Sequence, residues 1–146
     1  MDREEMLSLW SSMWEEGNWV PSWPDSLAGL TADAAAWTPE PPCHSIWAEV
    51  THVIFWRQIT LRQIAGGPPS NEQEVNEKEF AVPEIKTDEV WAATVATLKQ
   101  TQDAIAAAIQ DPAQNVDRIP YHLIHDAYHL GRVTQLRIML GTAPKF

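Results

Sequence analysis

Residues 120–140 read PYHLIHDAYHLGRVTQLRIML, and this stretch predicts a long helix that carries three of the chain's five histidines. Pro120 suits the first turn of a helix, where no N–H partner is needed, and Gly141 supplies a natural end. Residues four apart lie on one face of a helix, about 6 Å apart along its axis. The side chains of His125 and His129 are therefore expected to project side by side.

The same face of this helix continues as an apolar row. Val133, Leu136 and Leu140 follow the two histidines at helical spacing. A row of this kind packs against the core, so both imidazoles are expected to face the interior. Two imidazoles make an incomplete metal site, because a catalytic zinc site uses three protein ligands and an open position. A third ligand must come from another element.

A second long helix is expected from about Ser45 to Ile64, and it is apolar on almost all sides. Ser45 is a good N-cap, and Gly66 and Gly67 follow the end of the helix. A helix with this composition is central and buried. His52 lies in its middle, and an imidazole so placed must be hydrogen-bonded or metal-bound, because burying an unpaired one is costly.

Two further helices complete an all-α fold. Residues 3–16 carry apolar side chains at the spacing of one buried face, and residues 87–110 alternate spacings of four and three. The second pattern is typical of the seam of an antiparallel bundle. The sequence predicts one domain over residues 1–146, an antiparallel four-helix bundle with a long first connection and a long connection flanking the third helix.

The connections are expected to be mostly irregular. Residues 19–25 predict a connector broken by two prolines, and residues 31–36 predict one short turn of helix. The acidic stretch 66–86 is longer than usual for a connection within a compact domain. We expect it to be a solvated loop that is either mobile or functional, for example as a lid over a site.

Composition excludes several classes of function. The formal net charge is −10, with 20 acidic and 10 basic residues, so nucleic acid and anionic membrane surfaces are poor partners. The N-terminal residues lack the pattern of a signal peptide, and no apolar run approaches the length of a membrane span. The single cysteine, Cys43, excludes an intrachain disulfide framework. We expect a cytoplasmic protein.

The leading hypothesis is a metal site formed by His52, His125 and His129. Neutral imidazoles suit zinc, nickel, copper or ferrous iron. Three protein ligands leave an open position, where a bound water ionises near neutral pH or a substrate group is polarised. The opposing interpretation is that these are separate core or surface histidines.

A second hypothesis is a di-iron centre. Glu49 precedes His52 by three residues, and Asp126 precedes His129 by three. Di-iron bundles use two Glu-x-x-His motifs together with a Glu from each remaining helix. Here one motif has aspartate, and the third helix offers acids only near its ends, so the pattern matches poorly.

A third hypothesis treats residues 125–129, HDAYH, as a variant of the His-Glu-x-x-His metalloprotease motif. Aspartate is shorter than the usual general base, and only 17 residues follow His129 to supply a further ligand. The two remaining histidines are weaker candidates. We expect His122 to be exposed or to support a ligand from behind, and His44 to lie outside the site.

Two motifs together resemble the DinB/YfiT-like superfamily. They are residues 44–52, HSIWAEVTH, and residues 125–133, HDAYHLGRV. Residues 30–39 are also similar to the linker of that family, so the resemblance covers nearly the whole chain in order. One departure is visible, since the Gly-Gln that commonly follows the last ligand is Gly131-Arg132 here. The guanidinium is expected either to bind an anionic group or to point to solvent.

The resemblance implies a four-helix bundle, often a homodimer, with a divalent metal ion held by His52, His125 and His129. Zinc or nickel is the first expectation for that ion, with iron or manganese as alternatives. Activities in the family include metal-dependent hydrolysis and transfer or isomerisation reactions that use a low-molecular-weight thiol. In a dimer, the tryptophans between residues 10 and 23 would be candidates for the interface.

Two classes of function therefore remain. The chain is either a metal-dependent enzyme that acts on a small molecule, as a hydrolase or a thiol-dependent transferase or isomerase, or a metal-binding or interaction module without catalysis. The sequence assigns no catalytic side chain beyond the metal ligands.

Overall fold

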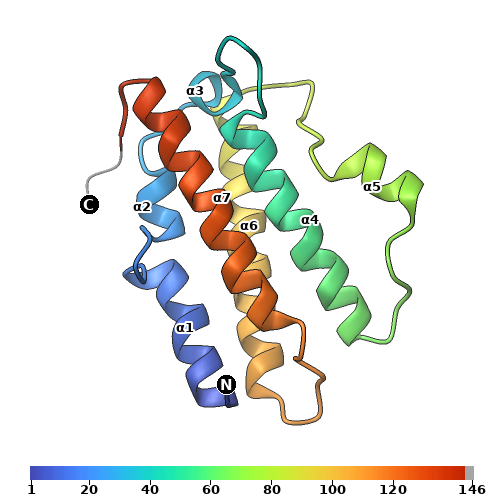
Figure 1. Cartoon of the computed structure of the whole chain (residues 1–146). Helices are drawn as coiled ribbons and strands as arrows, with labels where there is room; N and C mark the ends of the chain where they lie inside the picture. Colours follow the sequence, from blue (N-terminus) through green and yellow to red (C-terminus); the bar gives the residue numbers. More distant parts are fainter. Residues whose placement is uncertain (144–146) are drawn as a thin grey trace.

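The computed structural model describes residues 1–143, which form seven helices and, within that range, no strand (Figure 1). The four long helices pack as a bundle: α1 (Arg3–Glu15), α4 (Ile46–Ile64), α6 (Asp88–Gln110) and α7 (Ile119–Met139). Both α1 and α4 pack against α6 and α7, which places α1 and α4 diagonally across the bundle. The predicted all-α helical bundle is confirmed.

Three of the four long helices, α1, α4 and α6, begin at a side-chain cap, whereas α7 has none. Asp2 and Glu5 form a capping box at the start of α1. The side chain of Ser45 accepts a hydrogen bond from the backbone of α4, and that of Thr87 does the same for α6. These side chains satisfy N–H groups that a helix start would otherwise leave unpaired.

The short helix α2 (Trp23–Leu27) was not expected, because the prolines around it were taken to break helical structure. Ser22 caps this helix by accepting a hydrogen bond from the backbone N–H of Asp25. Pro24 then lies in the first turn, where its fixed φ angle favours a helix and its missing N–H costs nothing. The predicted turn of helix before α4 is present as α3 (Ala32–Ala36).

The helix α5 (Glu72–Lys78) lies within the stretch that was expected to be a solvated loop. Asn71 caps it by accepting a hydrogen bond from Glu74 N–H, and Arg62 of α4 holds Glu74 through two hydrogen bonds of 3.0 and 2.9 Å. None of its residues is buried. It is therefore a surface helix held by its cap and by one ion pair.

Helices α4 and α7 run in opposite directions, as expected for neighbours in an antiparallel bundle. Glu49 in the first half of α4 contacts His129, whereas Thr60 near the end of α4 contacts His122, which is earlier in α7. This antiparallel register is what brings the histidines of the two helices together.

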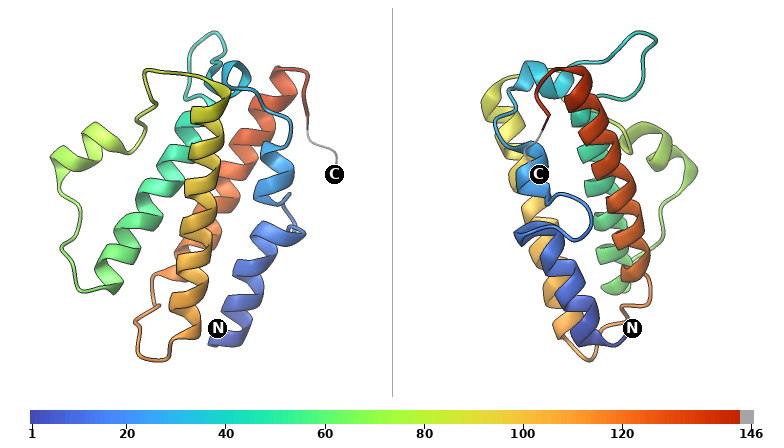
Figure 2. Two further views of the ribbon diagram at one scale, coloured as in Figure 1. Left: turned by 180° about the vertical axis from the view of Figure 1, so that it is seen from behind. Right: turned by 60° about the vertical axis from the view of Figure 1, so that its left-hand side comes forward.

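Helices α4 and α6 instead run in the same direction, which differs from a bundle in which all neighbours are antiparallel. Trp47 donates a hydrogen bond to Thr94, and further along both helices Arg57 donates one to Thr101. The physical reason is the path of residues 65–87, which return along the outside of the bundle (Figure 2). They bring the chain back to the end at which α4 began.

The core is rich in tryptophan. Trp10, Trp23 and Trp47 are fully buried, so Trp10 and Trp23 pack inside the protein and are not the interface residues that were suggested. Trp19 is the opposite case, since its side chain is fully exposed. Within residues 1–143, no helix is both long enough and apolar enough to cross a membrane.

One ion pair lies at the centre of the bundle. Arg57 of α4 and Asp126 of α7 are both fully buried, and Arg57 Nη2 donates a hydrogen bond to Asp126 Oδ2. Trp23 Nε1 donates to the same oxygen at 3.2 Å, and Arg57 Nη1 donates to Thr101 Oγ1 at 3.2 Å. The guanidinium also lies 4.6 Å from the ring centroid of Trp10. The pair therefore joins α4 to α7 and contacts three further helices, α1, α2 and α6.

Replacing one partner of this pair should destabilise the fold strongly. In Arg57→Ala, Asp126 would be left as an uncompensated buried charge, which costs about 3–5 kcal/mol. Urea unfolding of the metal-free protein measures this loss directly. The control is Arg62→Ala, which removes an arginine from an exposed pair and should change the free energy of unfolding little. Equal losses in the two variants would contradict a central role for Arg57.

Candidate metal centre

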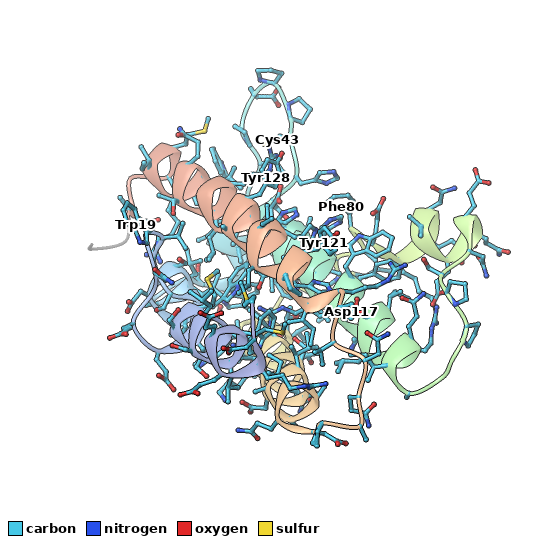
Figure 3. All side chains as sticks on the ribbon, turned by 60° about the horizontal axis from the view of Figure 1, so that its bottom comes forward. Trp19, Cys43, Phe80, Asp117, Tyr121 and Tyr128 are labelled. Atoms are coloured by element: carbon cyan, nitrogen blue, oxygen red, sulfur yellow. The ribbon has the colours of Figure 1, made fainter. Side chains whose placement is uncertain are left out.

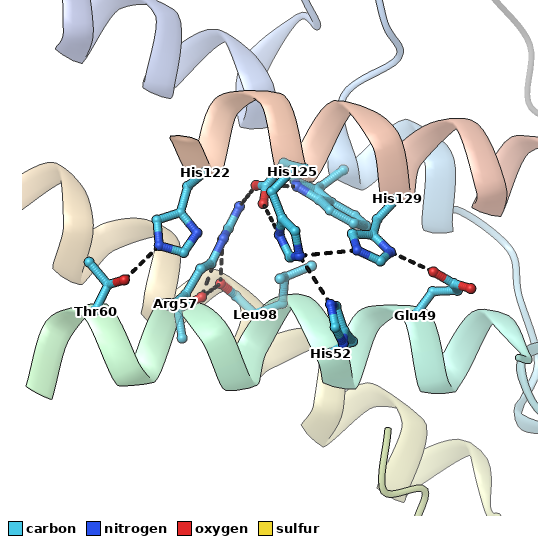
Figure 4. Close-up of polar contacts among 11 residues, drawn as sticks. Glu49, His52, Arg57, Thr60, Leu98, His122, His125 and His129 are labelled. Atoms are coloured by element: carbon cyan, nitrogen blue, oxygen red, sulfur yellow. Dashed lines mark hydrogen bonds and ion pairs between the residues drawn. The ribbon is translucent and has the colours of Figure 1, made fainter. Parts of the chain in front are cut away.

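Three histidines meet between α4 and α7 (Figure 4). His125 Nε2 lies 3.0 Å from His52 Nε2 and 3.1 Å from His129 Nε2. One ring nitrogen from each residue lies within 4.8 Å of the other two. The structure therefore brings together the three residues that the sequence suggested as ligands.

The geometry of these nitrogens fits a divalent ion. Zinc–nitrogen bonds of about 2.0–2.1 Å at tetrahedral angles place the ligand nitrogens about 3.3 Å apart. The observed separations of 3.0 and 3.1 Å are close to that value. The three-histidine group can hold a metal ion with only small side-chain shifts.

Glu49 fixes the tautomer of His129. Its Oε2 lies 2.5 Å from His129 Nδ1, and an ionised carboxylate can only accept a hydrogen bond. His129 Nδ1 therefore carries the proton, and Nε2 presents its lone pair to the other two histidines. Carboxylates commonly orient metal-binding histidines in this way.

Arg132 binds the second carboxylate oxygen of Glu49. Its Nε donates a hydrogen bond of 2.6 Å to Glu49 Oε1. Burial raises the pKa of Glu49, but the hydrogen bonds from His129 and Arg132 outweigh that effect and hold the pKa below its usual value. The guanidinium of Arg132 was expected to bind an anion or to point to solvent, and the anion that it binds is Glu49.

His52 is covered by the long connection between α4 and α6. The ring of Phe80 stacks on His52 with centroids 4.2 Å apart, and Glu79 Oε2 lies 3.5 Å from His52 Nδ1. Burial, together with the nearby His129 and His125, lowers the pKa of His52 to about 4. At neutral pH the ring is therefore uncharged, which is the form that binds metal ions.

His125 is the most accessible of the three histidines, with 28% of its side chain exposed. It lies at the edge of a cavity of about 690 Å³. The lining residues come from α4, from α7 and from the segment just before α7, and they are Trp56, Thr60, Asp117, Arg118, Tyr121, His122 and His125. The cavity therefore reaches the histidine cluster from one side.

His122 is buried, with 7% of its surface exposed, which excludes the exposed position but not the alternative that it supports a ligand. Its Nε2 lies 2.8 Å from Thr60 Oγ1, and burial lowers its pKa to about 4. His122, His125 and Asp126 form a second group with ligand atoms close together. A cation there would lie beside the guanidinium of Arg57, which already neutralises Asp126, so the three-histidine group is the better metal site.

The two hypotheses that use carboxylates as metal ligands or bases find no support. Glu49 is held by His129 and Arg132, and Asp126 is held by Arg57. Both oxygens of Glu49 are engaged, and Asp126 is paired with Arg57 through Oδ2 while its Oδ1 is buried without a hydrogen-bond partner, so neither residue has the arrangement of a bridging iron ligand or of a base beside the three histidines. The roles of Glu49 and Arg132 were missed because they depend on the register of α4 against α7.

The sequence model of the DinB superfamily matches residues 22–137. The matched range contains His52, His125 and His129, and it extends from just before α2 almost to the end of α7. No curated protein and no solved structure matches the chain.

Removing one histidine of the group should abolish metal binding. We expect His52→Ala to lose most of the metal that untagged wild-type protein carries, as measured by elemental analysis, because two imidazoles hold an ion weakly. His44→Ala is the comparison variant, since His44 is exposed, lies outside the group and reaches His52 only through the ring of Phe80, and it should keep most of its metal. Equal metal contents in wild type and His52→Ala would show that the site is wrong.

Glu49→Gln should weaken metal binding without abolishing it. Loss of the carboxylate that orients a ligand typically costs 10- to 100-fold in metal affinity, so we expect a loss of about tenfold or more in a chelator competition titration. Glu79→Gln serves for comparison, because Glu79 makes no hydrogen bond to His52 and its effect should be smaller. Wild-type affinity in Glu49→Gln would exclude this role.

Proposed function

The chain belongs to the DinB superfamily, and from that membership and its histidine group we propose that it is a divalent-metal-dependent enzyme acting on a small molecule. One observation carries the proposal. The three ring nitrogens converge beside a cavity of about 690 Å³, and His125 belongs to both the group and the cavity wall. A substrate in the cavity would lie next to the bound ion.

His52, His125 and His129 would hold the ion, with zinc or nickel as the first candidates and iron or manganese as the alternatives. When bound through three imidazoles, a divalent ion keeps an open position and supplies Lewis-acid chemistry there. Glu49 holds His129 in the required tautomer, and Arg132 keeps Glu49 ionised and in place. Phe80 covers the outer face of His52 and excludes water from it.

The proposed reaction types are hydrolysis and thiol-dependent transfer or isomerisation. Among residues 1–143, the two buried carboxylates beside the group are each paired with an arginine. Proton transfer by a side-chain carboxylate is therefore disfavoured. This arrangement favours a reaction whose nucleophile, a water or a small thiol, is activated by the ion itself.

The pairing of both buried carboxylates with arginine also favours a second candidate, a metal-binding module without catalysis. A site whose two buried carboxylates are both paired with arginine is also what a purely metal-binding protein would show. The two candidates differ in what happens at the open position, which only the enzyme uses for a substrate.

The test uses cobalt-loaded protein and a panel of small thiols, amides and esters. The enzyme hypothesis predicts that at least one compound changes the visible absorption of the cobalt and is turned over. His129→Ala should reduce turnover to background, and Trp19→Ala, which changes a fully exposed side chain outside the histidine group, should leave it unchanged. If no compound in the panel alters the spectrum or is converted, the module without catalysis becomes the better interpretation.

A further inference from the structure

The cavity beside His125 has two aromatic walls. Trp56 comes from α4 and Tyr121 from α7, so the cavity lies between the two helices that carry the histidine group. Trp56 also contacts the group itself, because its ring meets the ring of His52 edge to face with centroids 6.3 Å apart. Figure 3 shows Tyr121 and Asp117 near the start of α7. A molecule between these walls would therefore lie beside the metal ligands.

Neither aromatic side chain that lines the cavity is fully buried in the core of the protein. Tyr121 is 71% exposed although it is a large aromatic residue, and Trp56 is only partly buried. Exposed rings contribute little to folding, but two aromatic rings that line one cavity offer a large contact area to an apolar ligand. The volume of about 690 Å³ lies in the usual range for small-molecule sites.

The polar groups of the cavity do not select a charged ligand. Thr60 and His122, which line it, are buried, uncharged and 2.8 Å apart, so neither requires a counter-ion, and His122 Nδ1 is left without a hydrogen-bond partner. At its exposed rim, Asp117 and Arg118 carry opposite charges. The net charge of −10 further disfavours the approach of anions.

We propose that this cavity is the substrate pocket, and that the substrate is a small uncharged molecule with an aromatic or similarly bulky apolar body and one polar metal-binding group. The body would lie between Trp56 and Tyr121, and the polar group would point past His125 to the open position of the ion. The inference rests on the proposed function, because it requires that open position.

Three hydroxamates with the same metal-binding head test the inference. Acetohydroxamate has a methyl group as its body, benzohydroxamate has a phenyl ring, and 4-carboxybenzohydroxamate adds a negative charge to that ring. The measurement is the Kd of each for cobalt-loaded protein, from the change in visible absorption. We expect benzohydroxamate to bind at least about tenfold more tightly than acetohydroxamate, because the ring is buried between aromatic walls. The added carboxylate should give no gain.

Two variants locate the binding of the ring. Trp56→Ala and Tyr121→Ala should each bring the Kd values of acetohydroxamate and benzohydroxamate closer together. Tyr121 is mostly exposed, so its removal should leave the fold and the cobalt spectrum intact even if Trp56→Ala disturbs them. Trp19→Ala is the control, because Trp19 is fully exposed and does not line the cavity, and it should keep the wild-type ratio.

The possible results distinguish failure of the proposed pocket from failure of the proposed function. Equal Kd values for acetohydroxamate and benzohydroxamate in wild type would overturn the pocket, and so would an unchanged ratio in Tyr121→Ala. Tighter binding of the carboxylated compound would overturn the uncharged class of substrate. If none of the hydroxamates changes the cobalt spectrum, the open position itself is missing and the proposed function fails.

Discussion

The buried ion pair of Arg57 and Asp126 is the constraint on which the rest of the structure depends. Two charges that are fully removed from water depend on their direct bond and on further hydrogen bonds, although Arg57 Nε and Asp126 Oδ1 make none here. Trp23 and Thr101 supply two of those bonds, and they come from α2 and α6. The pair thereby fixes both the distance and the register of α4 against α7.

That register determines where the histidines lie. His125 directly precedes Asp126, and His52 lies five residues before Arg57 on α4. Once Arg57 faces Asp126, His52 faces the histidine pair of α7, and Glu49, nearly one turn earlier, meets His129. The two buried carboxylates therefore have different roles. Asp126 holds the helices together, whereas Glu49 orients a ligand, and this leaves the proposed chemistry to the ion and the cavity.

Local features of the sequence predicted much of the fold. Ser45 marks the start of α4 because capping involves only neighbouring residues, and the spacing of His125 and His129 places them on one face. The parallel direction of α4 and α6 was not predicted, because it depends on the path of a long connection. The burial of His122 and the pairing of Glu49 with Arg132 were missed for a related reason, since both depend on contacts between helices that are distant in sequence.

The most direct test of this account is the position of the bound metal in a crystal of the metal-loaded protein, located by anomalous diffraction at the absorption edge of that metal. A three-histidine site predicts one strong peak per chain between α4 and α7, about 2.0–2.1 Å from Nε2 of His52, His125 and His129 if the metal is zinc. It also predicts that Glu49 remains hydrogen-bonded to His129 Nδ1. A metal that is bound elsewhere, for example at His122 and Asp126 or on the surface, would show that His52, His125 and His129 are not the metal site.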